Sequence, residues 1–193
     1  MSSAVLHFEP LAIPGAWEVR PRRFEDARGS FVKVFVRSAF DDCGLETDFD
    51  EQYHSVSVRG VLRGLHFQVP PVDHAKLVYC AHGSVLDAVV DLRIGSPTYR
   101  QAATVQLRAD VGNALYVPRG LAHGFLVTSE SALMVYNVTS EHAPAADTGI
   151  RWDSAGIAWP ERAPTVSPRD TAFERLSDFV SPFRFDATAD APD

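Results

Sequence analysis

A single histidine stands among cationic and amide side chains in the segment "VRGVLRGLHFQVPP", residues 58–71. Histidine titrates near neutrality in its reference state, so His66 is a candidate base for proton transfer. Arg63 in the same segment can bind a phosphate through its planar fork, and Lys76 can stabilise an oxyanion as it forms. A base, an oxyanion stabiliser and an anion clamp together favour removal of a proton beside a carbonyl group.

A metal site is the alternative use of the same residues. The segment "GNALYVPRGLAHGF" resembles the second signature of the cupin jelly-roll barrels, in which the histidine, here His123, often binds metal. The first cupin signature is incomplete, because Gly60 and His66 match it but the second histidine is Gln68 and the glutamate position falls on Lys76. Lysine brings a positive charge where a metal needs an anion, and glutamine is a poor transition-metal ligand. The sequence therefore predicts no metal site.

The elements that must position these side chains are short strands. Apolar runs with period-two alternation dominate the chain, and glycine- or proline-containing turns separate them, as in an all-β sandwich or barrel. Few helices are expected. One is "SAFDDCG" (38–44), with Ser38 as its cap, and another is "RDTAFERLSDF" (169–179). "SFVKVFV" (30–36) reads as one strand. The predicted fold is a cupin-type jelly-roll barrel, all-β with a few short helices.

Length and composition predict one domain over 1–185 and a disordered tail over 186–193. The formal net charge is −7 and no Lys/Arg run occurs, so neither nucleic acid nor an anionic membrane is an expected partner. Two cysteines make no disulfide framework. The start of the chain lacks signal-peptide features and no apolar stretch reaches about 18 residues, which predicts a cytoplasmic location.

Four segments carry a family resemblance: "GVLRGLHFQ", "AKLVYCAHGSVLDAVVDLRIGSPTY", "LYVPRGLAHGFLV" and "GIRWDSAGIAWP". They closely resemble the dTDP-4-dehydrorhamnose 3,5-epimerases and related nucleotide-sugar epimerases, over about residues 14–170. The resemblance implies a jelly-roll homodimer that uses no metal and no redox cofactor. It also implies a nucleotide-diphosphate 4-keto-6-deoxy sugar as substrate, epimerised at the carbons that flank the keto group.

The resemblance also implies roles for single residues. His66 resembles the base that takes the α-proton, Asp170 the carboxylate that orients it, and Lys76 the group that stabilises the enolate. Tyr136 matches the acid that returns a proton to the opposite face. Residues expected to bind substrate are Arg28, Phe31 and Arg63 at the nucleotide diphosphate, with Gln68 and, paired with Asp87 deeper in the pocket, His123.

One geometric difficulty concerns Arg63 and His66. Their opposite parity would aim them at opposite faces of a regular strand. Both can line one pocket only if the strand bulges, and Gly64 is the expected place.

Four further pocket positions depart from the family pattern. Lys33 stands where the family has glutamate, Glu51 where it has glutamine, Tyr53 where it has asparagine, and His142 where it has tyrosine. We expect these residues to contact the substrate and to alter its base, its sugar or the carbon inverted, since a change from glutamate to lysine is hard to absorb without a changed partner.

Four other functions stay open from the sequence. A single-carbon epimerase and a keto-isomerase would use the same base on a related substrate. A non-catalytic cupin that binds sugar nucleotides would need neither His66 nor Tyr136. A metal-dependent cupin would contain substantial iron or zinc, which metal analysis would detect.

Overall fold

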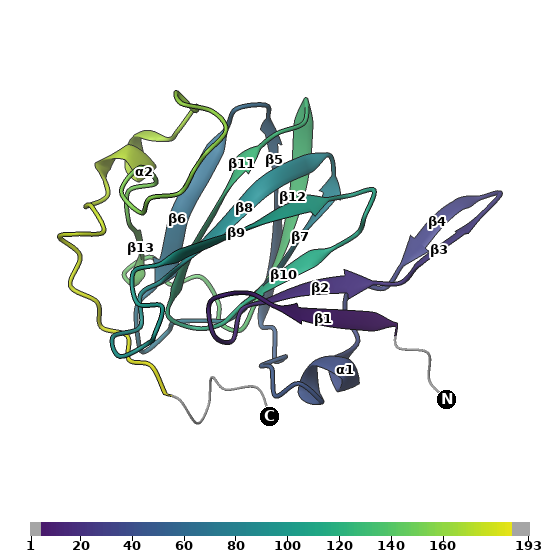
Figure 1. The fold of residues 1–193 in the computed structure, drawn as a ribbon, viewed down its shortest axis with the longest axis horizontal. Coiled ribbons are helices and arrows are strands. Elements are labelled where there is room, and N and C mark those ends of the chain that lie inside the picture. Colours follow the sequence, from purple (N-terminus) through teal and green to yellow (C-terminus); the bar gives the residue numbers. More distant parts are fainter. Residues whose placement is uncertain (1–4, 187–193) are drawn as a thin grey trace.

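Two antiparallel β-sheets pack face to face in the computed structural model, which describes residues 5–186 (Figure 1). The six-stranded sheet has the order β1 (Leu6–Pro10), β2 (Trp17–Pro21), β10 (Ala114–Val117), β7 (Lys76–His82), β12 (Ser131–Val138) and β5 (Glu51–Val58). The five-stranded sheet has the order β13 (Asp147–Gly149), β6 (Leu62–Gln68), β11 (Leu121–Val127), β8 (Ser84–Asp91) and β9 (Ala102–Arg108). This arrangement agrees with the predicted all-β jelly roll.

The main core lies between the sheets. Alternate residues of each strand point inward, so that Val78 and Met134 of one sheet meet Val89 and Phe125 of the other. All four side chains are almost fully buried. Burying such side chains stabilises the fold by roughly 1.5–3 kcal/mol each, and it fixes which alternate residues face the space between the sheets.

Two smaller apolar clusters cover the outer faces of the sheets. On the five-stranded sheet, Phe67 packs against Phe179 and Phe183 of the C-terminal segment. On the six-stranded sheet, Phe40 of helix α1 (Arg37–Asp41) lies in an aromatic cluster with Phe8 and Tyr116. The C-terminal segment is thereby held beside β6, on the side of the barrel where the site lies (Figure 1).

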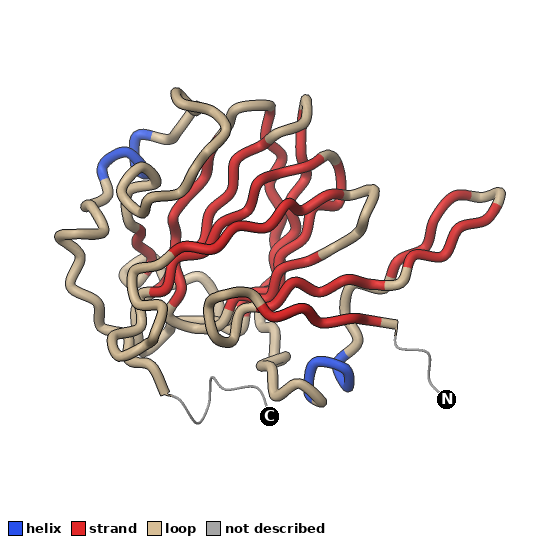
Figure 2. Tube along the Cα trace, in the orientation of Figure 1, coloured by secondary structure: helices blue, strands red, loops and turns tan. Residues whose placement is uncertain are grey.

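The two helices are shorter than the sequence predicts, or begin elsewhere (Figure 2). Helix α1 follows Val36, and Ser38 lies inside it without acting as the cap. Helix α2 (Pro168–Ala172) is capped by the Ser167 hydroxyl, which accepts a hydrogen bond from the Asp170 amide. The predicted extension of this helix to 179 is wrong, because Phe173 turns to extended backbone and packs its ring against His66.

The predicted strand over 30–36 is also shorter than expected. It forms β4 (Gly29–Val32), which pairs with β3 (Arg23–Asp26) in a separate two-stranded hairpin. Val34 and Val36 then leave the hairpin and pack under α1. The predicted tail, 186–193, lies outside the described residues except for Asp186. Over residues 5–186, no helix has the length and apolarity that crossing a membrane requires.

Candidate active site

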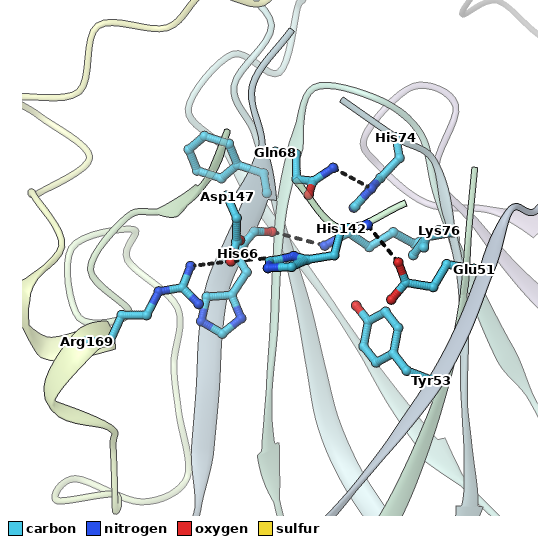
Figure 3. Close-up of a pocket in the computed structure, with 11 residues that line it drawn as sticks. Glu51, Tyr53, His66, Gln68, His74, Lys76, His142, Asp147 and Arg169 are labelled. Atoms are coloured by element: carbon cyan, nitrogen blue, oxygen red, sulfur yellow. Dashed lines mark hydrogen bonds and ion pairs between the residues drawn. The ribbon is translucent and has the colours of Figure 1, made fainter. Parts of the chain in front are cut away.

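A pocket of about 290 Å³ opens between the two sheets (Figure 3). The five-stranded sheet contributes His66, Phe67 and Gln68 from β6 and Asp147 from β13. The six-stranded sheet and its loops contribute the opposite wall, and α2 contributes Arg169; the remaining lining residues are Glu51, Tyr53, His74, Lys76, Val138 and His142. The pocket therefore brings together six of the predicted site residues: His66, Gln68, Lys76, Glu51, Tyr53 and His142.

His66 is paired with a buried carboxylate behind it. Its Nε2 lies 2.9 Å from Asp170 Oδ1, and the Gly64 amide donates to the other carboxylate oxygen at 3.1 Å. Burial alone would raise the pKa of Asp170, but the hydrogen bonds from His66 and Gly64 outweigh it and hold the pKa below its ordinary value. Because the carboxylate accepts, we assign the proton to Nε2 and leave Nδ1 as the nitrogen free to take a proton.

Lys76 lies on the opposite wall from this pair. Its ammonium donates to the His66 carbonyl at 3.2 Å. Burial lowers the pKa of Lys76 to about 8, although the negative charges of Asp147 and Asp87 act against this shift. A buried ammonium with so few partners is well suited to receive developing negative charge on a ligand oxygen.

The strand that carries His66 bulges where the sequence predicts. Gly64 and Leu65 of β6 together oppose the single residue Gly124 of β11. Gly64 has φ +140°, and a Cβ there would lie 2.6 Å from the Gly124 Cα. The bulge lets Arg63 face the other sheet as His66 does, since Arg63 Nε donates to Ser57 Oγ of β5 at 2.9 Å.

His123 and Tyr136 lie deeper between the sheets and do not line the pocket. His123 Nε2 is 2.9 Å from Asp87 Oδ1, and both side chains are buried. The His123 ring meets the Tyr136 ring edge-on at 6.2 Å, and the Tyr136 hydroxyl is 3.4 Å from Ser55 Oγ. Burial raises the pKa of Tyr136 far above its ordinary value, so its hydroxyl keeps its proton.

Three of the four substituted positions, Glu51, Tyr53 and His142, line the pocket. Glu51 Oε2 accepts a hydrogen bond from the His142 backbone amide at 2.7 Å. The Tyr53 ring stacks on Tyr136, with 4.7 Å between centroids and 15° between planes. Gln68 is held by the Val72 carbonyl and the Ala143 amide. Gln68 is thus fixed by backbone groups of the surrounding loops.

Three predicted substrate-binding residues, Arg28, Phe31 and Lys33, lie away from this pocket. Arg28 and Phe31 are in the β3–β4 hairpin, which projects from the barrel (Figure 1), and Lys33 follows it. Arg23 ties the base of the hairpin to the Asp110 carbonyl. Phe31 is 58% exposed. Within the described chain these three residues do not join the pocket.

Three polar residues that line the pocket were not predicted from the sequence: His74, Asp147 and Arg169. Burial lowers the pKa of His74 to about 3, with help from Lys76 and Arg119, so this imidazole is neutral. Arg169 is paired with Asp147 at 2.8 Å. The position of Arg169 next to Asp170 in the sequence was the one signal that could have predicted Arg169 as a pocket residue. No feature of the sequence around Asp147 indicates that it lines the pocket. Within residues 5–186, no three His, Cys, Asp or Glu side chains are grouped as metal ligands.

The fold and this site define a cupin-type jelly roll with acid–base groups between its sheets. A family model described as dTDP-4-dehydrorhamnose 3,5-epimerase matches residues 10–178. The dTDP-4-dehydrorhamnose 3,5-epimerase of Sinorhizobium fredii is 35% identical over 93% of this chain and 94% of its own. The dTDP-4-dehydrorhamnose 3-epimerase of Streptomyces niveus is 38% identical over 86% of this chain and 81% of its own.

A solved structure agrees with these relatives. NovW, a 4-keto-6-deoxy sugar epimerase from the novobiocin biosynthetic gene cluster of Streptomyces spheroides, superposes with a TM-score of 0.86 at 36% identity, covering 90% of this chain and 89% of NovW. The chain belongs to the dTDP-4-dehydrorhamnose 3,5-epimerase family. The predicted family and fold class are confirmed, and so is an epimerase of the isomerase class as the kind of enzyme.

Proposed function

We propose that this protein epimerises a dTDP-linked 4-keto-6-deoxy sugar at one or both carbons beside the keto group. The observation that carries the proposal is the His66–Asp170 pair, 2.9 Å apart, at the wall of a pocket that also holds Lys76. The family, and the substrates in the names of its members from S. fredii and S. niveus, support the ligand class.

The first step is proton abstraction by His66. Its Nδ1 takes the α-proton, the C–H electron pair moves toward the carbonyl, and an enolate forms. Asp170 holds the imidazole through Nε2 and stabilises the imidazolium that results. Lys76 then faces the enolate oxygen with its ammonium, which offsets the new negative charge.

Inversion requires a proton from the opposite face of the planar enolate. Tyr136, on β12 of the sheet opposite β6, is the acid that the family pattern implies. Its raised pKa keeps the phenol protonated until it is used. This role remains a proposal, as do substrate contacts by Arg63, Gln68 and His123. Turnover without metal or redox cofactor likewise remains a prediction.

We propose a homodimer as the active form, in which each hairpin serves the pocket of the other subunit. Arg28 and Phe31 can bind the nucleotide diphosphate only if they reach a pocket, and within their own chain the hairpin projects away from it (Figure 1). An exposed phenylalanine beside an arginine suits a nucleobase and a phosphate. Lys33 would accompany them.

The outer face of the six-stranded sheet supports self-association. Val56 and Val58 of the edge strand β5 are 62% and 64% exposed. Next to them, Leu133, Val135 and Tyr79 line a shallow depression on the same face. These exposed apolar side chains suit burial against a second copy of the chain, and Gln52 and His54 border them in the same depression. The cytoplasmic location predicted from the sequence remains a prediction.

Inversion at a single carbon is the second candidate. It is favoured by the placement of Glu51, Tyr53 and His142, three departures from the family pattern that all line the pocket. The S. niveus relative, named as a 3-epimerase, shows that family members of this kind exist. Altered side chains in the pocket lining would limit how far the sugar can turn to present its second carbon.

Incubation with dTDP-4-keto-6-deoxyglucose in deuterated water tests the proposal. We expect proton NMR to show deuterium at C3, at C5 or at both, together with the inverted sugar. Deuterium at one carbon alone would select the single-carbon candidate. No deuterium at either carbon, with protein shown to be folded by circular dichroism, would contradict the proposed substrate.

A further inference from the structure

Tyr53, not Tyr136, presents its phenol to the pocket. Tyr53 is among the residues that line it, and in Figure 3 its hydroxyl points inward. Tyr136 lies behind the Tyr53 ring, stacked at 4.7 Å, and is 7% exposed against 41% for Tyr53. The phenol that the family pattern implies as the acid therefore lies deeper than a second phenol, which lines the pocket.

The strand register creates this arrangement. Tyr53 of β5 is directly opposite Tyr136 of β12, so both side chains leave the sheet on the same face, toward the core. β5 is the edge strand, while β12 lies between β5 and β7. Tyr136 is consequently enclosed, with Ser55 at its hydroxyl and His123 at its ring edge. Tyr53, on the edge strand, remains exposed to the pocket.

The Tyr53 hydroxyl is free for a ligand. It makes no hydrogen bond to any other residue within 5–186, although Glu51 and Asp147 lie near enough to influence it. Partial burial and these two carboxylates raise the pKa of Tyr53 to about 12, so the phenol is protonated at neutral pH. It stands on the wall opposite β6, which carries His66.

We propose that Tyr53 is a further catalytic acid, which returns the proton at one or both of the carbons whose α-proton His66 removes. The inference rests on the proposed epimerase function. Base and acid then lie on opposite walls of one pocket, as inversion at a planar carbon requires. Of the two stacked phenols, Tyr53 is the one that lines this pocket.

The protons balance within this scheme. His66 takes the proton from carbon and becomes an imidazolium, and the electron pair becomes the enolate that Lys76 faces. The Tyr53 O–H bond then breaks, a new C–H bond forms on the opposite face, and a phenolate remains. Water reprotonates the phenolate, because Tyr53 is 41% exposed, and the imidazolium returns its proton to solvent. Nothing is oxidised or reduced.

The test compares Tyr53→Phe with the wild-type enzyme on dTDP-4-keto-6-deoxyglucose in deuterated water. Two rates are followed by NMR at each carbon: entry of deuterium, and formation of the inverted configuration. Phenylalanine keeps the ring stack on Tyr136, and thermal unfolding checks the fold. Tyr99→Phe, in the turn after β8 and outside the pocket, is the matched control.

We expect Tyr53→Phe to slow inversion at one carbon or both by tenfold or more, while deuterium still enters there with retained configuration because His66 returns it to the same face. Inversion slowed by less than tenfold at both carbons would overturn the inference. Equal loss of exchange and inversion would also overturn it, since that is the signature of lost binding. A wild-type enzyme that exchanges neither carbon would instead refute the underlying function.

Discussion

At the scale of residues, the surroundings of each titratable side chain in the site set its protonation state. Asp170 stays ionised because it accepts hydrogen bonds from His66 and from the Gly64 amide. Lys76 is a cation held in a dry position with a pKa lowered to about 8. Tyr53 has its pKa raised, so it stays neutral. A base, a cation and an acid thus coexist near neutral pH without neutralising one another.

Lys76 predicts an alkaline limit to activity. Its pKa of about 8 means that the ammonium is present below pH 8 and is lost as pH rises through that value. We expect kcat/KM to fall about tenfold per pH unit above that point, because the enolate loses its counter-charge. A pH–rate profile checks this. Arginine stays charged at this pH, so the Lys76→Arg variant should not show the alkaline fall in kcat/KM. An unchanged alkaline fall in that variant would mean that another group causes it.

Replacing the Asp170 carboxylate is expected to lower kcat while the protein remains folded. Asp170→Asn can accept from His66 or from the Gly64 amide but not from both, and it no longer stabilises the charged imidazole, so we expect kcat to fall by about 100-fold or more. Steady-state assay of the purified variant measures this. Asp153→Asn, which changes a carboxylate paired with Arg151 outside the pocket, is the control. A rate within threefold of wild type would show that Asp170 does not assist His66.

At the scale of elements, the bulge in β6 turns Arg63 and His66 toward the same side, facing the other sheet. The parity of Arg63 and His66 together with Gly64 made this bulge predictable from sequence, since only a bulge reconciles them. The stack of Tyr53 on Tyr136 was not predictable, because it depends on the register of two strands far apart in the chain. The helix predicted over 169–179 is longer than helix α2, because packing against His66 draws Phe173 out of helical geometry.

Gly64→Ala should destabilise the protein. The new Cβ would meet the Gly124 Cα at 2.6 Å in a backbone with φ +140°. Backbone strain of this kind costs on the order of 1–3 kcal/mol, and the clash adds to it. Urea unfolding measures the change. Gly95→Ala, also at positive φ but with open space around it, isolates the clash. Equal losses of unfolding free energy in the two variants would show that the close approach of β6 and β11 does not add to the cost of Gly64→Ala.

At the scale of the whole molecule, the residues of the site come from both sheets. β6 carries His66, while β7 and β5 of the other sheet carry Lys76 and Tyr53. The family motifs located these strands, but the sequence gives no sign of where the hairpin with Arg28 and Phe31 points. That direction depends on how β2 and β3 join, and in the proposed homodimer the hairpin serves the pocket of the second chain.

Complementation tests this division of the site between subunits. His66→Ala and Arg28→Ala should each be inactive alone. Co-expressed with two different tags, they should recover about a quarter of wild-type activity, because half the dimers are mixed and one site in each mixed dimer is intact. Size-exclusion chromatography checks the dimer. No recovery in a confirmed mixed dimer would mean that each hairpin serves its own pocket.

The central claim is that His66, held by Asp170, removes the α-proton. The direct measurement is the rate at which deuterium from solvent enters C3 and C5 of dTDP-4-keto-6-deoxyglucose. It is made with wild type, His66→Ala and the control His7→Ala, an exposed residue of β1 at the other edge of the six-stranded sheet from β5. We predict exchange with wild type and His7→Ala, and a loss of at least 100-fold with His66→Ala. Exchange that survives in folded His66→Ala protein would contradict the account.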